Sequence, residues 1–421
     1  MKVYKFGGAS INSVDRIKNV GSIITGTGNE KLLIVISAIG KTTNALEAVV
    51  NAFFDGRQEE ALQLFENIKQ NHLATLKYLV TLEWEKAENQ LRDFFTEIEW
   101  LLHDKPVRNY DYYYDQVVCC GELFSSSIVY HYLREQKINA AWVDVRDILR
   151  TDNNFRDAGL DWAHTEKNVQ QQVLPLFSNH DVVITQGYIG ATDENESTTL
   201  GREGSDYSAA IFANLLPAVS VTIWKDVDAV MNADPKHFPA AVKLDELSYA
   251  EVIEMAYYGA QVIHPKTIKP LQNKGIPLLV KSFLDPTLPG TSISNKSTRD
   301  LPPVIVLKEN QVLMYFKSKD YSFVEDEPVE QLDHVFKEIK IKPNLSQNTA
   351  ISLLCCFDDH PEKIAALAIA ADAFFDVEIE KNLTLLTIRH YDEASIQQLS
   401  KGRVIVLEQK TLQTVQLLLR Q

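Results

Sequence analysis

The octapeptide at 199–206, TLGREGSD, combines residue types that bind anions. Its two glycines allow the backbone to approach a ligand closely, and the helix expected after it would offer unpaired N–H groups at its start. Arg202 adds a planar guanidinium suited to a carboxylate or phosphate, and Asp206 could hold a metal ion or orient a neighbouring base. The same residues would also suit a capped helix without a ligand, with Ser205 or Asp206 as the cap. Taken alone, the octapeptide favours neither interpretation.

A second anion-binding pattern lies near the N-terminus. A strand expected at 3–6 is followed by Gly7 and Gly8, and Lys5 would reach an anion from the end of that strand. A strand, a glycine turn and then a helix form a layout that cradles phosphate. The sequence has no GxxxxGK[ST] loop, and no GxGxxG fingerprint with its acidic partner, so a nicotinamide enzyme is disfavoured.

Charged residues also gather after the strand expected at 220–225. Asp226 and Asp228 could face magnesium or a ribose, while Lys225 and Lys236 could neutralise phosphate charge. A solvated loop would explain the same composition. Three aspartates and two lysines at one strand end favour a nucleotide site.

Glu122 follows Gly121 within an apolar segment of small residues. A carboxylate there would be costly to bury without a cation, and a substrate ammonium is one candidate. The alternative is a glutamate on a helix surface, which the spacing alone favours.

The elements that must position these residues follow from hydrophobic patterns. Apolar runs of strand length at 3–6, 32–38, 140–143 and 182–184 alternate with helical patterns. This alternation predicts an α/β fold, a three-layer αβα sandwich with a mostly parallel central sheet. A helical stretch at about 45–104 contains no strand and is interpreted as an excursion from the sheet.

The pattern changes near residue 297. A stretch at 295–303, with Ser, Thr, Asp and two prolines, is the best linker candidate. We therefore predict a catalytic domain at 1–297 and a separate α+β module at 298–421, with no helix after Leu383. Within the module, strands are expected at 304–307, 311–316, 351–357, 383–389 and 403–408, and helices at 329–339 and 360–373.

Composition narrows the function classes. The chain has 421 residues, enough for about two or three domains, and a formal net charge of −15, which argues against a general binder of nucleic acid or anionic membranes. No apolar run has membrane-spanning length, and the first residues do not resemble a signal region. The four cysteines form two adjacent pairs in apolar segments, a pattern typical of buried thiols rather than metal ligands. We expect a cytoplasmic protein.

Seven motifs in order resemble aspartate kinase of the amino-acid kinase superfamily over residues 1–295. They are KFGGAS, the loop at 37–44, GELFSS, TLGREGSD, WKDVDAVMNADPK, LSYAEVIEMAYYGAQVIHPKT and IPLLVKSFLDPTLPGT. The module at 298–421 resembles, more loosely, the ACT pair that follows this catalytic domain. The resemblance implies transfer of the ATP γ-phosphoryl group to the side-chain carboxylate of L-aspartate, giving 4-phospho-L-aspartate, the first step toward lysine, threonine and methionine. Magnesium would accompany ATP, and the ACT-like module would form a homodimer.

The resemblance also implies residue roles. Lys5 and Asp206 would be catalytic, with Lys5 neutralising the transferring phosphoryl group and Asp206 organising it. Glu122 would take the ammonium of aspartate and Arg202 a carboxylate, within the set Thr43, Glu122, Arg202, Glu203, Gly204 and Ser205. The nucleotide would contact Gly7, Gly8, Lys225, Asp226, Met231, Lys236, Gln261 and Val262. Since a carboxylate is already a nucleophile, positioning and charge neutralisation would suffice for catalysis.

Several positions depart from the family pattern. Ala9 replaces a threonine near the phosphates, and Glu203 replaces a glycine in the anion-binding turn. Met231 replaces a tyrosine, and Gln261 replaces a lysine expected at ATP. The usual Gly-Phe-Leu of the regulatory module is not evident at 321–323. We therefore expect no feedback inhibition by lysine or threonine.

Three hypotheses fit these observations. The first is an aspartate kinase with altered nucleotide affinity or weak allostery. The second is another carboxylate-directed kinase of the superfamily, such as a glutamate or carbamate-type kinase. The third is a catalytically weak paralogue that binds ligands and regulates. The first explains the largest number of motifs.

Overall fold

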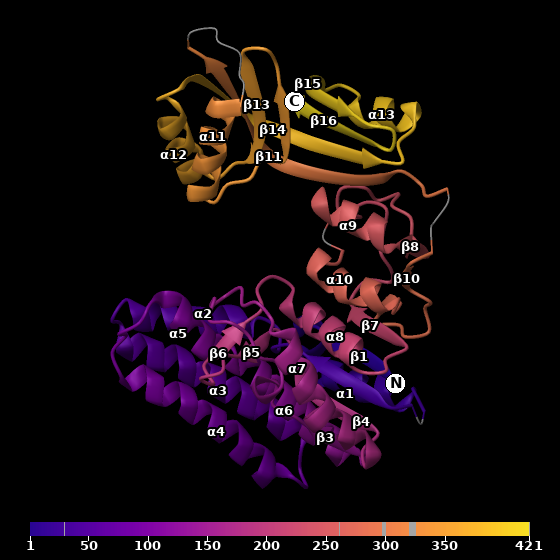
Figure 1. Cartoon of the computed structure of the whole chain (residues 1–421). Helices are drawn as coiled ribbons and strands as arrows, with labels where there is room; N and C mark the ends of the chain where they lie inside the picture. The colour runs from indigo at the N-terminus through magenta and orange to yellow at the C-terminus, as the bar shows by residue number, and fades with distance from the viewer. Residues whose placement is uncertain (29, 261, 297–299, 320–325, 421) are drawn as a thin grey trace. The chain divides into compact units, whose positions relative to one another are not determined.

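The computed structural model describes residues 1–28, 30–260, 262–296, 300–319 and 326–420, which form two compact units (Figure 1). The first unit consists of Met1–Val230, Lys243–Ile253 and Gln261–Thr298. The second consists of Met231–Val242, Glu254–Ala260 and Arg299–Gln421. Two segments from the range predicted for the catalytic domain thus belong to the second compact unit.

An eight-stranded sheet forms the centre of the first unit, with the order β3-β4-β2-β1-β7-β9-β10-β8. Neighbouring strands from β3 to β9 pair in parallel, and β10 pairs antiparallel with β9. The strands are β1 (Lys2–Phe6), β2 (Leu32–Ile36), β3 (Ala140–Trp142), β4 (Val182–Gln186), β7 (Ser220–Lys225), β8 (Glu246–Ser248), β9 (Leu278–Ser282) and β10 (Thr291–Ser294). Every residue of β2 and β4 is buried, as expected for strands covered on both faces.

Helices connect the strands of this part of the chain. They are α1 (Val14–Thr25), α2 (Thr42–Phe54), α3 (Gln58–Leu79), α4 (Trp84–His103), α5 (Tyr110–Val118), α6 (Cys120–Glu135), α7 (Trp162–Asn168), α8 (Gly204–Leu215), α9 (Tyr249–Tyr257) and α10 (Pro265–Lys274). Helices α2, α3 and α4 follow one another without a strand, which agrees with the predicted helical excursion. Helix α6 packs against β2 and β4 as well as α3 and α4. Because it is enclosed in this way, α6 is buried on nearly all sides, and its buried residues include Glu122 and three serines.

The second unit is built on a six-stranded antiparallel sheet with the order β12-β13-β11-β14-β16-β15. Its strands are β11 (Val304–Ser318), β12 (Leu345–Asn348), β13 (Ser352–Asp358), β14 (Phe375–Arg389), β15 (Val404–Lys410) and β16 (Thr414–Arg420), and its helices are α11 (Asp326–Glu338), α12 (Pro361–Ala371) and α13 (Glu393–Ser400).

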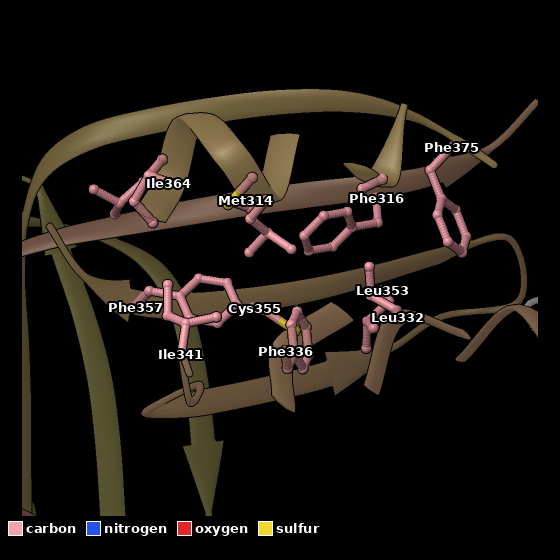
Figure 2. Close-up of a cluster of buried hydrophobic side chains, with 13 residues drawn as sticks. Met314, Phe316, Leu332, Phe336, Ile341, Leu353, Cys355, Phe357, Ile364 and Phe375 are labelled. Carbon is pink, nitrogen blue, oxygen red and sulfur yellow. The ribbon is translucent and has the colours of Figure 1, made fainter. Parts of the chain in front are cut away.

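One hydrophobic core of the second unit lies between its sheet and two helices. Figure 2 shows Met314 and Phe316 of β11 facing the same core as Phe336 of α11 and Ile364 of α12. Alternate residues of β13, including Phe357, complete this core because side chains of a strand point to opposite faces in turn.

Two predictions for the C-terminal module were wrong. The strands expected at 304–307 and 311–316 form one long strand, β11, with register shifts between Lys308 and Leu313. The absence of helices after Leu383 is contradicted by α13. This helix has only eight residues and none is fully buried, so its apolar pattern is limited to a short repeat that includes Ile396 and Leu399.

Within the described ranges, none of the helices combines the length and hydropathy needed to span a bilayer.

Candidate active site

The carboxyl ends of four neighbouring parallel strands meet at one edge of the first unit's sheet. Register aligns Phe6 of β1 with Ile36 of β2 and Trp224 of β7. Ile36 is aligned in turn with Gln186 of β4. The loops that follow these strands therefore start side by side. In open α/β sheets, ligands bind outside this edge.

Lys5 and Asp206 form a buried ion pair at this edge. Lys5 Nζ lies 2.6 Å from Asp206 Oδ1, and the side chains are only 13% and 4% exposed. Asp206 stands in the first turn of α8, where the helix dipole favours a carboxylate. Its Oδ1 atom has no aligned hydrogen-bond donor among the described residues, although the lysine is close. The structure thus brings the two predicted catalytic residues together.

The turn formed by Gly7 and Gly8 lies beside this pair. A Cβ atom on Gly7 would lie 3.2 Å from Lys5 Nζ. A Cβ atom on Gly8 would lie 2.7 Å from the carbonyl oxygen of Ala38 and 2.9 Å from that of Gly40. Gly40 N also donates a hydrogen bond to Gly8 O at 3.1 Å. Close packing of the turn against the loop after β2 therefore requires glycine at position 8.

Glu122 is buried in the first turn of α6, with 3% of its surface exposed, so its interpretation as a surface glutamate was wrong. Its Oε1 atom accepts a hydrogen bond from Ala38 N at 3.3 Å, whereas Oε2 has no partner among the described residues. Burial raises the pKa of Glu122 to about 8, against the opposing effects of the Ala38 hydrogen bond and the charge of Lys5. An unpaired buried carboxyl oxygen is suited to an incoming cation.

The start of α2 contacts the start of α6. A Cβ atom on Gly121 would lie 3.3 Å from Thr42 Cγ2. Thr43, the next residue of α2, is half-buried, and its hydroxyl forms no hydrogen bond with the described residues. The structure thus places Thr43 on an element that contacts the Glu122 helix, as a substrate role would require.

Glu203 closes the turn before α8 in a left-handed backbone conformation, with φ 53° and ψ 29°. Its Oε2 atom accepts a hydrogen bond from His264 N at 2.8 Å, so its carboxylate is held by the backbone at the start of α10. Helix α8 begins at Gly204. The alternative of a helix capped by Ser205 or Asp206 was therefore wrong, because both residues lie inside the first turn.

Arg202 and Ser205 differ in their surroundings. Arg202 is exposed, and its guanidinium forms no hydrogen bond or ion pair with the described residues. Ser205 is buried against the end of β4, where a Cβ atom on Gly187 would lie 2.6 Å from Ser205 Cβ. The guanidinium therefore remains available to an anion, whereas the serine is fixed beside the sheet edge.

Asp115, on α5, anchors the strand that leads into the octapeptide. This strand is β6 (Ser197–Thr199), which pairs with β5 (Ile189–Ala191). Asp115 Oδ2 accepts hydrogen bonds from Thr199 N at 2.8 Å and Arg156 N at 2.9 Å, and Oδ1 accepts one from Thr199 Oγ1 at 2.7 Å. Burial raises the pKa of Asp115 to about 6, although these hydrogen bonds oppose the shift.

Asp115 was not predicted as a site residue. The sequence signal was available, since an acid stands among the buried residues Tyr114 and Val117 in a helical pattern. Its partners could not be predicted, because Thr199 lies 84 positions away along the chain.

The predicted nucleotide residues are only partly assembled by the described contacts. Lys225 Nζ, at the end of β7, donates a hydrogen bond to Val262 O at 2.7 Å, and Asp226 beside it is exposed. Met231 and Lys236 belong to the second unit, and Gln261 lies outside the described residues. Their contribution to a nucleotide site stays a prediction. In the part of the chain that the structure describes, no three His, Cys, Asp or Glu side chains are grouped to hold a metal ion.

Comparison with known proteins identifies the family. Residues 1–282 match the amino acid kinase family. The chain belongs to this family. It is 36% identical over 320 residues to lysine-sensitive aspartokinase 3 of Escherichia coli (strain K12), an alignment that covers 75% of this chain and 69% of that protein. It is 32% identical over 304 residues to the chloroplastic bifunctional aspartokinase/homoserine dehydrogenase 1 of Zea mays, covering 71% of this chain. That alignment spans only 32% of the bifunctional relative.

Solved structures of amino acid kinases extend the likeness to the second unit. The chain matches E. coli aspartokinase III in complex with lysine and aspartate with a TM-score of 0.82 and 28% identity, covering 99% of this chain and 95% of that one. For the complex with aspartate and ADP, the TM-score is 0.80 at 28% identity, covering 100% and 96% of the two chains. The predicted fold class, an αβα sandwich followed by an ACT-like α+β module, is confirmed.

Proposed function

We propose that this member of the amino acid kinase family is an aspartate kinase, which transfers the γ-phosphoryl group of ATP to the side-chain carboxylate of L-aspartate. The observation that carries the proposal is the buried group formed by Lys5, Asp206 and Glu122 at the sheet edge. It offers a cation for a phosphoryl group and a carboxyl group for an ammonium. The similarity to aspartokinases over most of the chain supports the same substrate.

Catalysis in this site would depend on positioning and electrostatics. The carboxylate of aspartate is the nucleophile, so no strong base has to remove a proton. Lys5 would neutralise charge that develops on the transferring phosphoryl group, and Asp206 would hold the ammonium of Lys5 in place. Backbone N–H groups around Gly7 and Gly8 would cradle the phosphates.

Aspartate would be held between the starts of α2, α6 and α8. Glu122 Oε2, which lacks a partner, would accept a hydrogen bond from the substrate ammonium. Arg202 would form paired hydrogen bonds with a substrate carboxylate, and its exposed guanidinium has no competing contact among the described residues. Thr43, Gly204 and Ser205 would complete the pocket. The Glu203 side chain is engaged with His264 N, so Glu203 would contribute through its backbone in the turn.

The nucleotide would bind along the end of β7. Lys225 and Asp226 lie there, and Met231, Lys236, Gln261 and Val262 are the further residues proposed to contact ATP. Magnesium commonly enters such sites bound to phosphates and waters, with one or two carboxylates, and then neutralises phosphate charge. The exposed carboxylate of Asp226 at the end of β7 fits this mode, whereas Asp206 Oδ1 lies 2.6 Å from Lys5 Nζ and is already paired.

Trapping of the acyl phosphate as a hydroxamate, with ATP and either aspartate, glutamate or carbamate as acceptor, tests the activity. We expect product with aspartate alone. Turnover with glutamate or carbamate instead would favour another carboxylate-directed kinase. No turnover, together with thermal stabilisation by aspartate or ATP, would favour a ligand-binding paralogue.

The paired hydrogen bonds proposed between Arg202 and the substrate carboxylate, here called the carboxylate clamp, are tested by Arg202→Ala, with Arg202→Lys as the matched control. We expect Arg202→Ala to lower kcat/KM for aspartate by about 10²-fold or more while the protein still folds, because misplaced substrate reacts slowly. Arg202→Lys keeps the charge but loses the planar fork, so its activity should be intermediate. Near-normal activity of Arg202→Ala would contradict the clamp.

The oligomeric state and the cellular location of the enzyme are also part of this proposal. ACT-like modules pair in the family that the sequence resembles, so a homodimer through the second unit is part of this proposal. The four cysteines are free and buried, which is compatible with the proposed cytoplasmic location.

A further inference from the structure

A basic cavity of about 320 Å³ lies in the second unit, at the loop after α11 and the start of α12. Its lining includes four lysines and a histidine: Lys308, Lys340, Lys342, Lys363 and His360. None of the residues proposed for aspartate or ATP lines this cavity. It is therefore a different site from the one proposed for the kinase reaction.

The described contacts of the four lysines are hydrogen bonds and a ring contact rather than ion pairs. Lys308 Nζ donates a hydrogen bond to Asn344 Oδ1 at 2.7 Å, and Lys363 Nζ donates one to the carbonyl oxygen of Lys340 at 2.7 Å. Lys342 Nζ lies 5.2 Å from the centre of the Tyr257 ring. Among the described residues, no Asp or Glu forms an ion pair with any of the four. Asp358 is the one carboxylate in the lining, so the positive charges of the four lysines exceed the negative charge there.

Asp358, the single carboxylate in the lining, is held by two hydrogen bonds. Asp358 Oδ1 accepts hydrogen bonds from Gln311 Nε2 at 2.9 Å and from Asn344 Nδ2 at 3.0 Å. Partial burial disfavours its charged form, but these two hydrogen bonds and the nearby charge of Lys308 hold the pKa of Asp358 below its usual range. Asp358 thus orients Asn344, and Asn344 positions Lys308 at the wall of the cavity.

The backbone around the cavity adds to its preference for anions. Helix α12 begins with Pro361, and its N-cap residue, His360, makes no side-chain cap. The first-turn N–H groups and the positive end of the helix dipole are therefore left for a ligand or water. Lys340 has a left-handed backbone, with φ 53°, in the turn that leads from α11 to the cavity.

We propose that this cavity binds a small anion bearing a phosphate or diphosphate group. Lysine ammoniums act as compact point charges and are common ligands of phosphate groups, and four of them line this cavity. In a chain with a formal net charge of −15, four unpaired lysines around one cavity are a marked local exception. The volume is sufficient for a small phosphorylated metabolite.

Calorimetric titration of the full-length protein with inorganic pyrophosphate tests the proposal directly. The pocket variant combines Lys340→Gln with Lys342→Gln, since both side chains are exposed and neither donates a hydrogen bond that holds the fold. The control variant combines Lys401→Gln with Arg403→Gln, which removes the same charge from an exposed turn of the same unit. A Lys5→Met variant removes the phosphate contact proposed for the active site.

We expect the pocket variant to bind pyrophosphate at least about 10-fold more weakly than the parent, and the control to differ by less than about twofold. Lys5→Met should still bind pyrophosphate at the cavity of the second unit. Equal affinity in the parent and the pocket variant, binding lost only in Lys5→Met, or no binding to the parent at physiological salt would each overturn the proposal. Since the readout is binding rather than turnover, its result is independent of whether the chain phosphorylates aspartate.

Discussion

At the scale of single residues, burial decides what the charged groups of this kinase can do. Glu122 and Asp206 are both acidic and both buried, yet their partners differ. Asp206 is paired with Lys5, whereas one oxygen of Glu122 is unpaired. A carboxyl group that lacks a cation in the free protein favours its neutral form until a substrate cation arrives.

This difference predicts a proton released on substrate binding. The pKa of Glu122 is raised to about 8, so its carboxyl group is mostly protonated at pH 7, and the aspartate ammonium should favour its ionised form. Binding at pH 7 should therefore release close to one proton, and affinity should increase as pH rises toward 8. Calorimetry in two buffers of different ionisation enthalpy measures the proton count.

Glu122→Gln is the control for this effect. It should abolish the proton release and raise KM for aspartate by about 10- to 100-fold, because a charge-assisted hydrogen bond is lost. Proton uptake by the parent, or unchanged release in Glu122→Gln, would show that another group titrates.

A second residue-scale prediction concerns the backbone at Glu203. A left-handed conformation strains a residue that carries a Cβ atom, and glycine avoids this strain. Glu203→Gly and Glu203→Ala both lose the hydrogen bond to His264 N, so their difference isolates the backbone. The glycine variant should be more stable than the alanine variant by about 1–2 kcal/mol in urea unfolding. Equal stability of the two would mean that the turn relaxes.

At the scale of elements, one buried carboxylate joins α5 to the strand before α8. Asp115 accepts both a backbone and a hydroxyl hydrogen bond from Thr199, which precedes the turn proposed to bind substrate. Asp115 is thus a positioning residue. The contact links α5, which packs against α2, to the loop that is proposed to bind aspartate.

Asp115→Asn tests this link. An amide NH₂ group, which cannot accept a hydrogen bond, would replace one carboxyl oxygen and face the donors of Thr199. We therefore expect a loss of about 2–3 kcal/mol in the free energy of unfolding. Because Thr199 leads into the turn, KM for aspartate should rise more than kcat falls. Thr199→Val removes the hydroxyl contact alone and should cost about 1 kcal/mol. A purely structural role would leave KM unchanged in the surviving folded protein.

The strand, glycine and helix arrangements around the site were predictable element by element. Lys5, Gly7 and Gly8 were placed at the end of a strand from the local pattern alone, and the structure agrees. Helix α13 was missed because it has only eight residues, which give its apolar pattern, Ile396 and Leu399, too little length to stand out.

At the scale of the whole molecule, the chain combines a kinase fold with a second unit whose departures from the family bear on regulation. The Gly-Phe-Leu that the family pattern places at 321–323 is absent, and these positions lie outside the described residues. The relative with 36% identity is named lysine-sensitive, whereas no inhibition by lysine is expected for this chain.

We expect millimolar lysine or threonine to leave the aspartate kinase activity unchanged. The reason is that the Gly-Phe-Leu of the family's regulatory module is not evident at 321–323, where this sequence has Tyr-Ser-Phe. Initial rates at saturating ATP, measured with each amino acid alone and with both together, provide the test. Clear inhibition by either would show that an amino-acid effector site persists in the second unit.

The sequence by itself determined the element types, the parallel sheet and the order of the anion-binding motifs, because these depend on residues that are neighbours along the chain. The tertiary structure alone decided which motif residues touch. The Lys5–Asp206 pair, the Glu122–Ala38 contact and the Asp115–Thr199 anchor each join positions far apart in the sequence, which only the packing of helices and strands brings together. It also decided that the Glu203 carboxylate binds His264 N, since a side-chain direction depends on packing rather than on spacing.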